Sequence, residues 1–150
     1  MSISRFNAEG YHDPTAYAAL TAIELEEKRE ARREERLPRH LVFICSPYAG
    51  DVAQNIKNAR RYCRFAVKQG MIPFAPHLLY PQFLDDKKPE QRSLGMYYGL
   101  AWLRKCDQLW CFGTRFTAGM KKELQAARRR KLPIKFFDEN MEVHHDTDAV

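Results

Sequence analysis

Three short segments of this sequence combine hydroxyl, imidazole or carboxyl side chains with the glycines and prolines of tight turns. They are residues 46–51, 76–80 and 113–119. The first offers the hydroxyl groups of Ser46 and Tyr48, and the ring of Tyr48 could also stack on a nucleobase. A few polar groups beside an aromatic ring suit a small ligand with a flat portion. These segments are therefore the candidate binding loops.

The first segment, SPYAGD, has the composition of a strand-to-helix turn. Pro47 and Gly50 can shape the turn, and Asp51 can cap the helix that follows. The segment lacks both the G-x-x-x-x-G-K-[ST] and the G-x-G-x-x-G pattern, so it is neither a P-loop nor a dinucleotide fingerprint. A turn without any ligand role remains the alternative.

The third segment leads into a predicted helix that carries the clearest candidate for chemistry. Thr117 can cap this helix, and Gly119 lets a ligand approach the backbone closely. Free N–H groups at a helix start bind phosphate, and Arg115 adds a positive charge beside them. Glu123 lies about one turn inside the helix, where its carboxylate could point back to the mouth of the site. The alternative is a surface glutamate that is favourable near a helix N-terminus.

The middle segment contains His77, which follows a predicted strand. An imidazole there could bind a ligand hydroxyl or phosphate, or act as an acid or base. Next to Pro76, it could equally serve only to fix the loop. Tyr97, Tyr98 and Trp102, on a predicted helix further along, are expected to lie in the core.

The elements that must position these segments alternate between strand and helix after residue 38. Continuous apolar runs predict strands over Leu41–Cys45, 71–75, Gln108–Phe112 and Ile134–Phe137. Helical periodicity predicts helices over 15–36, 52–69, 91–105 and 118–131, with a long loop over 76–90. Such alternation predicts a doubly wound, flavodoxin- or Rossmann-like parallel sheet of four to five strands with helices on both faces. In these sheets ligands bind at the carboxyl ends of the strands, where the three segments would meet.

Composition divides the chain into an N-terminal helical appendage (1–38), an α/β domain (39–140) and a tail (141–150). Residues 1–38 carry 6 Lys/Arg and 8 Asp/Glu, whereas residues 39–150 carry 19 and 11, so the body has a net charge of +8. A basic body suits an anionic ligand such as a phosphate, although plain solubility explains it as well. Nucleic-acid binding is not favoured, because the basic clusters on the predicted helices have no aromatic side chains between them.

The four cysteines are Cys45, Cys63, Cys106 and Cys111, and no two of them form a C-x-x-C pair. We expect buried free thiols rather than disulfides, and neither a metal site nor an organic cofactor. The sequence has no apolar run of about 20 residues and no secretory signal at its start. It therefore predicts a cytoplasmic protein that does not contact a membrane.

The order of the motifs resembles that of the nucleoside 2-deoxyribosyltransferase-like superfamily, and is most similar to a bacterial and phage branch of it. The resemblance extends over residues 41–137 and is carried by four stretches, FICSPYAGD, IPFAPHLLYPQF, CDQLWCFG and TAGMKKELQAA. Its better-studied members cleave the N-glycosidic bond between a deoxyribose and its base. Their last motif holds a hydroxyl residue, a glycine two positions later and a nucleophilic glutamate four positions after that. Thr117, Gly119 and Glu123 have this spacing.

The resemblance implies a role for each matching residue. Glu123 would attack the anomeric carbon and form a glycosyl ester, which water or a second base would resolve. Thr117 and Gly119 would hold a phosphate or the sugar end, and residues 46–50 would line the sugar and base pocket. Asp107 matches an aspartate that opens the third strand of the relatives.

The chain also departs from this pattern. A second acid usually lies eight positions before that aspartate, where this chain has Gly99, so Asp85, Asp86 or His77 would have to replace it. Lys121 replaces a common glycine and adds a cation that could serve a phosphate. A missing acid could cost about 10²–10⁴-fold in rate.

The sequence thus supports a nucleoside or nucleotide N-glycosidase or 2-deoxyribosyltransferase-like enzyme with Glu123 as nucleophile. Gly99 favours the alternative, a non-catalytic module that binds or senses nucleotides. A third hypothesis is an adaptor whose charged N-terminal helix docks a protein partner. The relatives are commonly oligomeric, so a homo-oligomer is a further expectation.

Overall fold

The computed structural model describes residues 6, 9–10, 13–37 and 40–144. The chain divides into two compact units, residues 1–37 and 38–150. The boundary expected from composition, between residues 38 and 39, falls outside the described residues. No helix in the described part of the chain combines the length and the apolar character needed to cross a bilayer.

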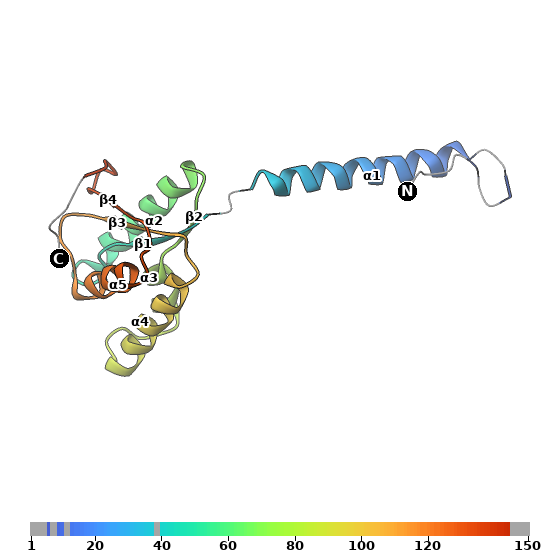
Figure 1. The fold of residues 1–150 in the computed structure, drawn as a ribbon. Helices are drawn as coiled ribbons and strands as arrows, with labels where there is room; N and C mark the ends of the chain where they lie inside the picture. The colour runs from blue at the N-terminus through green and yellow to red at the C-terminus, as the bar shows by residue number, and fades with distance from the viewer. Residues whose placement is uncertain (1–5, 7–8, 11–12, 38–39, 145–150) are drawn as a thin grey trace. The chain divides into compact units, whose positions relative to one another are not determined.

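The N-terminal unit contains one long helix, α1 (Pro14–Glu35), close to the predicted range (Figure 1). The side chain of Asp13 caps it by accepting hydrogen bonds from the backbone N–H groups of Thr15 at 3.1 Å and Ala16 at 2.9 Å. Pro14 occupies the first turn, where the missing N–H group costs nothing. None of the side chains of α1 is buried. Local interactions such as this cap therefore stabilise α1 rather than burial in a core.

The second unit contains a four-stranded parallel sheet in the order β2-β1-β3-β4, which confirms the predicted fold class (Figure 1). The strands are β1 (Leu41–Cys45), β2 (Ile72–Phe74), β3 (Gln108–Phe112) and β4 (Ile134–Phe137). The last four residues of β1 and of β3 are buried, as expected for central strands that are covered on both faces. All the strands run in the same direction, so their carboxyl ends open on one edge.

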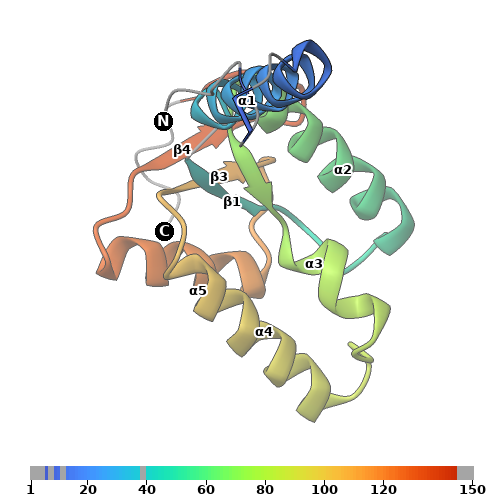
Figure 2. The same ribbon diagram turned by 90° about the vertical axis from the view of Figure 1, so that its right-hand side faces the viewer.

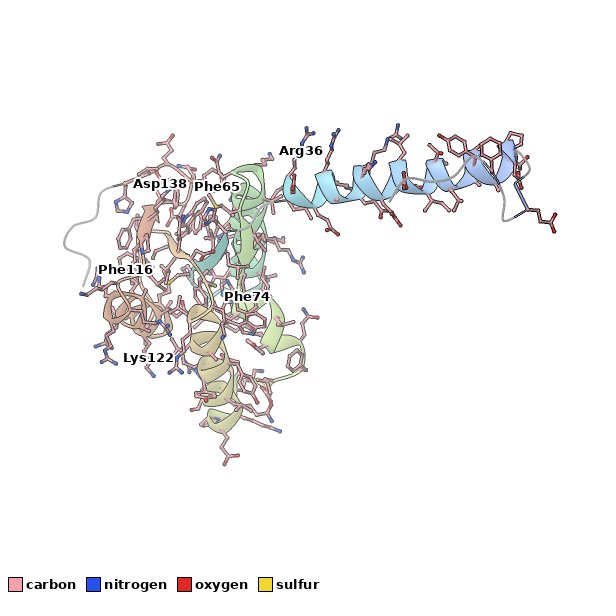
Figure 3. All side chains as sticks on the ribbon, turned by 45° about the vertical axis from the view of Figure 1, so that its right-hand side comes forward. Arg36, Phe65, Phe74, Phe116, Lys122 and Asp138 are labelled. Carbon is pink, nitrogen blue, oxygen red and sulfur yellow. The ribbon has the colours of Figure 1, made fainter. Side chains whose placement is uncertain are left out.

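Helices cover both faces of this sheet (Figure 2). One face packs on α2 (Val52–Lys68), which contributes Tyr62 and Phe65 to the core. The other face packs on α4 (Pro89–Leu103) and α5 (Ala118–Arg129), with Phe116 at its margin. Figure 3 labels Phe65 and Phe116, whose side chains belong to these two different core clusters.

The stretch predicted to be a loop, residues 76–90, is partly helical. It contains the short helix α3 (Pro76–Leu79) and a 3₁₀ turn, η1 (Tyr80–Gln82). Each has a proline in its first turn, where a fixed φ favours helix initiation. The prolines that the sequence analysis placed in a loop therefore begin short helices, and His77 lies on the first of these.

The prediction that Tyr97, Tyr98 and Trp102 are core residues is wrong. Tyr97 is 64% exposed and Trp102 is 45% exposed, because α4 turns this side outward. Gly99 and Leu103 are the buried residues of α4.

All four cysteines are free thiols. Cys45, Cys106 and Cys111 are buried as predicted, and Cys63 is half-buried.

The chain folds back after β4. Val143 forms an antiparallel bridge with Phe137, and the N–H group of His144 donates to the carbonyl of Phe136 at 3.1 Å. The first part of the predicted tail therefore pairs with the sheet, and residues 145–150 lie outside the described residues.

Candidate functional site

A cavity of about 330 Å³ opens at the carboxyl edge of the sheet. Its size is at the lower end of the range for small-molecule sites. The loop after β1, α3 with the turn that follows, α4 and the start of α5 all contribute to it. The predicted site residues that line it are Ser46, Tyr48, His77, Thr117, Gly119 and Glu123. The fold therefore brings residues from all three predicted segments together.

The loop after β1 is held by the helix that follows it. The side chain of Asp51 caps α2 by accepting from the N–H group of Gln54 at 3.2 Å. The side-chain amide of Asn55 donates to the carbonyls of Tyr48 at 3.0 Å and Ala49 at 3.1 Å. Gly50 has a φ of 102°, in the region that favours glycine. The loop is thus pinned at both ends, which fixes the Tyr48 ring beside the cavity.

His77 is positioned by α3 and by the first loop. Its Nε2 atom lies 2.9 Å from the hydroxyl oxygen of Ser46. Its ring centroid lies 6.2 Å from that of Tyr48. Burial lowers the pKa of His77 to about 4, so the imidazole is neutral at pH 7. It can therefore serve as a hydrogen-bonding group, but it carries no charge there.

Thr117 and Gly119 shape the start of α5. The hydroxyl oxygen of Thr117 accepts a hydrogen bond from the N–H group of Met120 at 3.3 Å and so caps the helix. This confirms the capping role predicted from sequence. A Cβ atom at Gly119 would lie 3.2 Å from the terminal methyl group of Met96 on α4. The start of α5 thus packs tightly on the flexible end of the Met96 side chain at the cavity.

Glu123 reaches the same cavity from the buried side of α5. It is only 8% exposed, whereas the preceding residue, Lys122, is exposed on the outer surface of the helix (Figure 3). Burial raises the pKa of Glu123 to about 7, and the nearby Cys45 thiol opposes this rise. The surface alternative is therefore wrong: α5 directs this carboxyl group into the domain. A carboxyl group with such a pKa can gain or lose a proton near neutral pH.

Three further polar residues line the cavity: Asp86, which the sequence offered as a replacement for the second acid, and Gln91 and Arg92, which were not identified from the sequence. Asp86, Gln91 and Arg92 form a polar rim, which we define by these three residues. The side-chain oxygen of Gln91 accepts from the N–H group of Asp85 at 2.6 Å, which ties the rim to the start of α4. No motif marks these residues, because they belong to the stretch interpreted as a loop and to the first turn of the following helix.

Other predicted site residues lie elsewhere. Asp107 precedes β3 at the amino edge of the sheet, where its carboxylate accepts from the N–H group of Leu41 at 2.7 Å. Pro47, Gly50 and Arg115 line a neighbouring hollow rather than the cavity. Lys121 is exposed and does not line the cavity.

The position expected to hold a second acid is a glycine that packs closely on α3 at the cavity wall. Gly99 is buried where α4 crosses α3, and a Cβ atom there would lie 3.3 Å from Cβ of Pro76. An aspartate at this position would require α3 or α4 to give way by a few tenths of an ångström. Of the described residues that line the cavity, Asp86 and Glu123 are the two with carboxyl groups.

The arrangement can bring a buried carboxyl group to one end of a bound molecule while aromatic and apolar side chains hold the rest. The apolar part of the lining includes Tyr80, Leu84 and Met96. Among the described residues, no group of three or more His, Cys, Asp and Glu side chains could hold a metal ion.

Comparison with known proteins gives a family and a fold. The family model "Domain of unknown function (DUF7768)" matches residues 40–137. No curated protein matches the chain. A 2-deoxyribosyltransferase from Bacillus psychrosaccharolyticus, described as a biocatalyst for nucleoside synthesis, is similar in structure, with a TM-score of 0.56 and 17% identity over 70% of this chain and 77% of that chain. A 2-deoxyribosyltransferase from Leishmania mexicana has a TM-score of 0.49 and 12% identity over 75% of this chain and 88% of its own. The second unit therefore has a nucleoside 2-deoxyribosyltransferase-like fold.

Proposed function

The chain belongs to the DUF7768 family, and we propose that it is a nucleoside or nucleotide N-glycosidase or 2-deoxyribosyltransferase-like enzyme that uses Glu123 as its nucleophile. The observation that carries the proposal is the position of Glu123. Its carboxyl group is buried at the wall of a cavity that also holds Thr117 and Gly119. The 2-deoxyribosyltransferase-like fold supports the same assignment.

The proposed reaction proceeds in two displacements. A carboxylate oxygen of Glu123 attacks the anomeric carbon, the bond to the base nitrogen breaks, and its electron pair leaves with the base. The base takes up a proton, and a glycosyl ester remains on the enzyme. Water, or a second base, then attacks the same carbon and frees the carboxylate, which gives net retention.

The surrounding groups support this chemistry through their protonation states. The nucleophile must be ionised, and with a pKa of about 7 a substantial fraction of Glu123 is ionised at neutral pH. His77 is neutral, so it can hydrogen-bond a sugar hydroxyl through one ring nitrogen while the other contacts Ser46. Asp86 lies on the same cavity and is the carboxyl group available to assist the leaving base.

The second candidate function is a non-catalytic module that binds or senses nucleotides. The observation in its favour is Gly99, which has no carboxyl group where a second acid is expected and packs closely on Pro76. Such a module would keep the cavity and lose the proton donor. It would bind the same compounds without releasing a base.

The test is to incubate the full chain with a panel of nucleosides and their 5′-monophosphates and to measure released base by chromatography. We expect release by the wild type and a loss of about 10³-fold or more in Glu123→Gln, because the nucleophile is gone. Lys122→Gln is the matched control, since it changes the neighbouring, outward-facing residue of the same helix.

The outcomes separate the candidates. Ligand-induced thermal stabilisation without base release, in wild type and Glu123→Gln alike, would replace the enzyme with the sensor. Neither release nor stabilisation would leave the adaptor hypothesis. Equal loss in Lys122→Gln and Glu123→Gln would contradict the assignment of the nucleophile.

A further inference from the structure

Helix α4 has no charged side chain over residues 93–103. Its inner side buries Leu103 and lines the cavity with Met96. A helix on the surface of a globular protein normally turns charged or polar residues to water. The opposite side of α4 instead presents four large side chains, which we define as its outer face: Leu94, Tyr97, Tyr98 and Trp102. Each of them is between 36% and 64% exposed. The composition of α4 is therefore typical of a helix that is covered on both sides.

The exposed aromatic surface extends beyond α4 to the 3₁₀ turn that precedes it. The centroid of the Tyr98 ring lies 6.1 Å from that of Tyr97 and 5.5 Å from that of Tyr80. The Tyr80 ring in turn lies 5.9 Å from that of Phe83, which is 63% exposed. An aromatic side chain presents about 150–250 Å², so four half-exposed rings leave on the order of 400 Å² in water. A patch of this size is typical of an interaction site, and it supplies about half of the roughly 800 Å² that each partner buries in a stable interface.

The two ends of this outer face carry opposite charges. Glu90 lies in the first turn of α4, whereas Arg104 and Lys105 follow its last residue. All three side chains are exposed, and among the described residues none of them takes part in an ion pair. Residues at steps of three or four share one side of a helix, and here they are Glu90, Leu94, Tyr97, Ala101 and Lys105. This side of α4 thus runs from an acidic end through an apolar middle to a basic end.

Such an order of charges is complementary to its own reverse. Two copies of α4 can lie antiparallel across a two-fold axis that passes between Tyr97 and Tyr98. A residue that lies a given number of positions before Tyr97 then faces the residue that lies the same number of positions after Tyr98. Glu90 of one copy therefore faces Lys105 of the partner subunit, at both ends of the pair.

The sizes of the apolar side chains match in the same arrangement. Leu94 faces the small Ala101 of the partner subunit, and the bulky Trp102 faces the partner subunit's Ser93. Large side chains opposite small ones let the ridges of one helix enter the grooves of the other. The face supplies both members of each contact, which favours a second copy of this chain over an unrelated partner.

We propose that the outer face of α4 is a homodimer interface, in which α4 of a second copy packs antiparallel on it about a two-fold axis at Tyr97 and Tyr98. The inference does not depend on the proposed function, since it concerns the side of α4 that faces away from the cavity. Pairing would hold α4 in place, and with it the cavity wall that Met96 and Gly99 form.

The first experiment measures the mass of the full chain by analytical ultracentrifugation at micromolar concentrations, where wild type should be a dimer. Tyr97→Asp brings two like charges together at the axis and should raise the dissociation constant about 100-fold or more. Val67→Asp is the matched control and should leave the dimer intact. Val67 is 58% exposed on α2, which covers the other face of the sheet. Circular dichroism checks that both variants keep the fold.

The second experiment exchanges the charges at the two ends of the face. Glu90→Lys alone, or Lys105→Glu alone, should weaken the dimer roughly tenfold at low salt, because symmetry creates two like-charge pairs. The double variant restores opposite charges and should return the dissociation constant close to the wild-type value. Glu90→Lys combined with Lys122→Glu is the control, because Lys122 lies on α5 and its exchange should restore nothing.

Several outcomes would overturn the inference. A monomeric wild type would show that no second copy covers this face. A dimer that survives Tyr97→Asp, or that Val67→Asp disrupts equally, would show that the copies meet at another surface. A double exchange that does not restore the dimer would contradict the antiparallel arrangement. If Tyr97→Asp does not fold, the charge exchanges decide. Base release enters none of these measurements, so the proposed function stands or fails separately.

Discussion

The cavity has ionisable side chains both at its inner wall, which we define by Glu123 and His77, and at its polar rim. The two regions differ in how far burial shifts the pKa values of these side chains. At the inner wall, burial raises the pKa of Glu123 to about 7 and lowers that of His77 to about 4. At the rim, Asp86 and Gln91 are half-buried and Arg92 is exposed. Glu123 is only 8% exposed, whereas His77 is half-buried like Asp86, so the contrast with the rim in access to water is largest for Glu123. The comparison teaches that access to water, rather than residue type, decides which group can exchange a proton near neutral pH.

The largest expected effect tests the inner wall through the pH dependence of stability. The folded pKa of Glu123, about 7, exceeds its ordinary 4.5, so its contribution to stability is complete below pH 4.5 and is lost as the pH rises to about 7. The folded pKa of His77, about 4, is below its ordinary 6.5, so its contribution is complete above pH 6.5 and is lost as the pH falls to about 4. Each difference between the folded and the ordinary pKa corresponds to about 3 kcal/mol of stability. Between pH 4.5 and 6.5 the two pH dependences have opposite signs and nearly cancel in the wild type.

Single variants should expose each contribution. In Glu123→Gln the free energy of unfolding should rise from pH 4 to 6.5, because the lowered pKa of His77 then acts without the opposing raised pKa of Glu123, whereas in His77→Gln it should fall from pH 4.5 to 7. Urea unfolding at each pH measures both slopes. Slopes of the same sign in the two variants would contradict the opposite pKa shifts of Glu123 and His77.

A second prediction concerns the packing that separates the inner wall from α4. Gly99→Asp should lower the free energy of unfolding by about 2 kcal/mol, since its new Cβ atom meets the rigid ring of Pro76. Gly95→Ala on the same helix is the control, because its nearest new contact would be an ordinary 3.7 Å. That control should gain up to about 1 kcal/mol from helix propensity. A Gly99→Asp variant that is as stable as wild type and faster in base release would show that the second acid fits after all.

At the rim, the effect on activity should be smaller and should leave the pH midpoint of base release unchanged. Asp86→Asn should lower kcat/KM for base release about tenfold, because it removes the second carboxyl group on the cavity. Its midpoint should stay at the wild-type pH, because water screens the rim charge from Glu123. Asp85→Asn is the control, since Asp85 does not line the cavity. A shifted midpoint in Asp86→Asn, or an equal loss in Asp85→Asn, would erase the distinction between rim and inner wall.

The smallest effect is expected outside the cavity. Lys122 is exposed on α5 and does not line the cavity. Lys122→Gln should change the free energy of unfolding by less than about 0.5 kcal/mol, as surface substitutions usually do, and should leave base release unchanged. Thermal unfolding and the base-release assay measure both effects. A loss above about 1 kcal/mol, or slower base release, would show that this side chain contributes to the fold or to the site.

Much of the fold could be predicted because its signals are local. The continuous apolar runs of β1 and β3 identify strands that are covered on both faces, and the helix boundaries follow from periodicity and from caps such as Thr117. Asp107 shows how a local match can mislead. It matched a motif, yet it precedes β3, and the first residue of a parallel strand necessarily lies at the edge away from the site.

The sequence by itself determined the order of the elements, the spacing of Thr117, Gly119 and Glu123, and the edge of the sheet at which they would meet. Only the tertiary structure decided that Glu123 is buried and that α3 places His77 beside Ser46. It alone also placed Asp86 on the cavity. The physical reason is that helix periodicity and capping depend on neighbours along the chain, whereas the burial of a carboxyl group depends on which distant surfaces close over it.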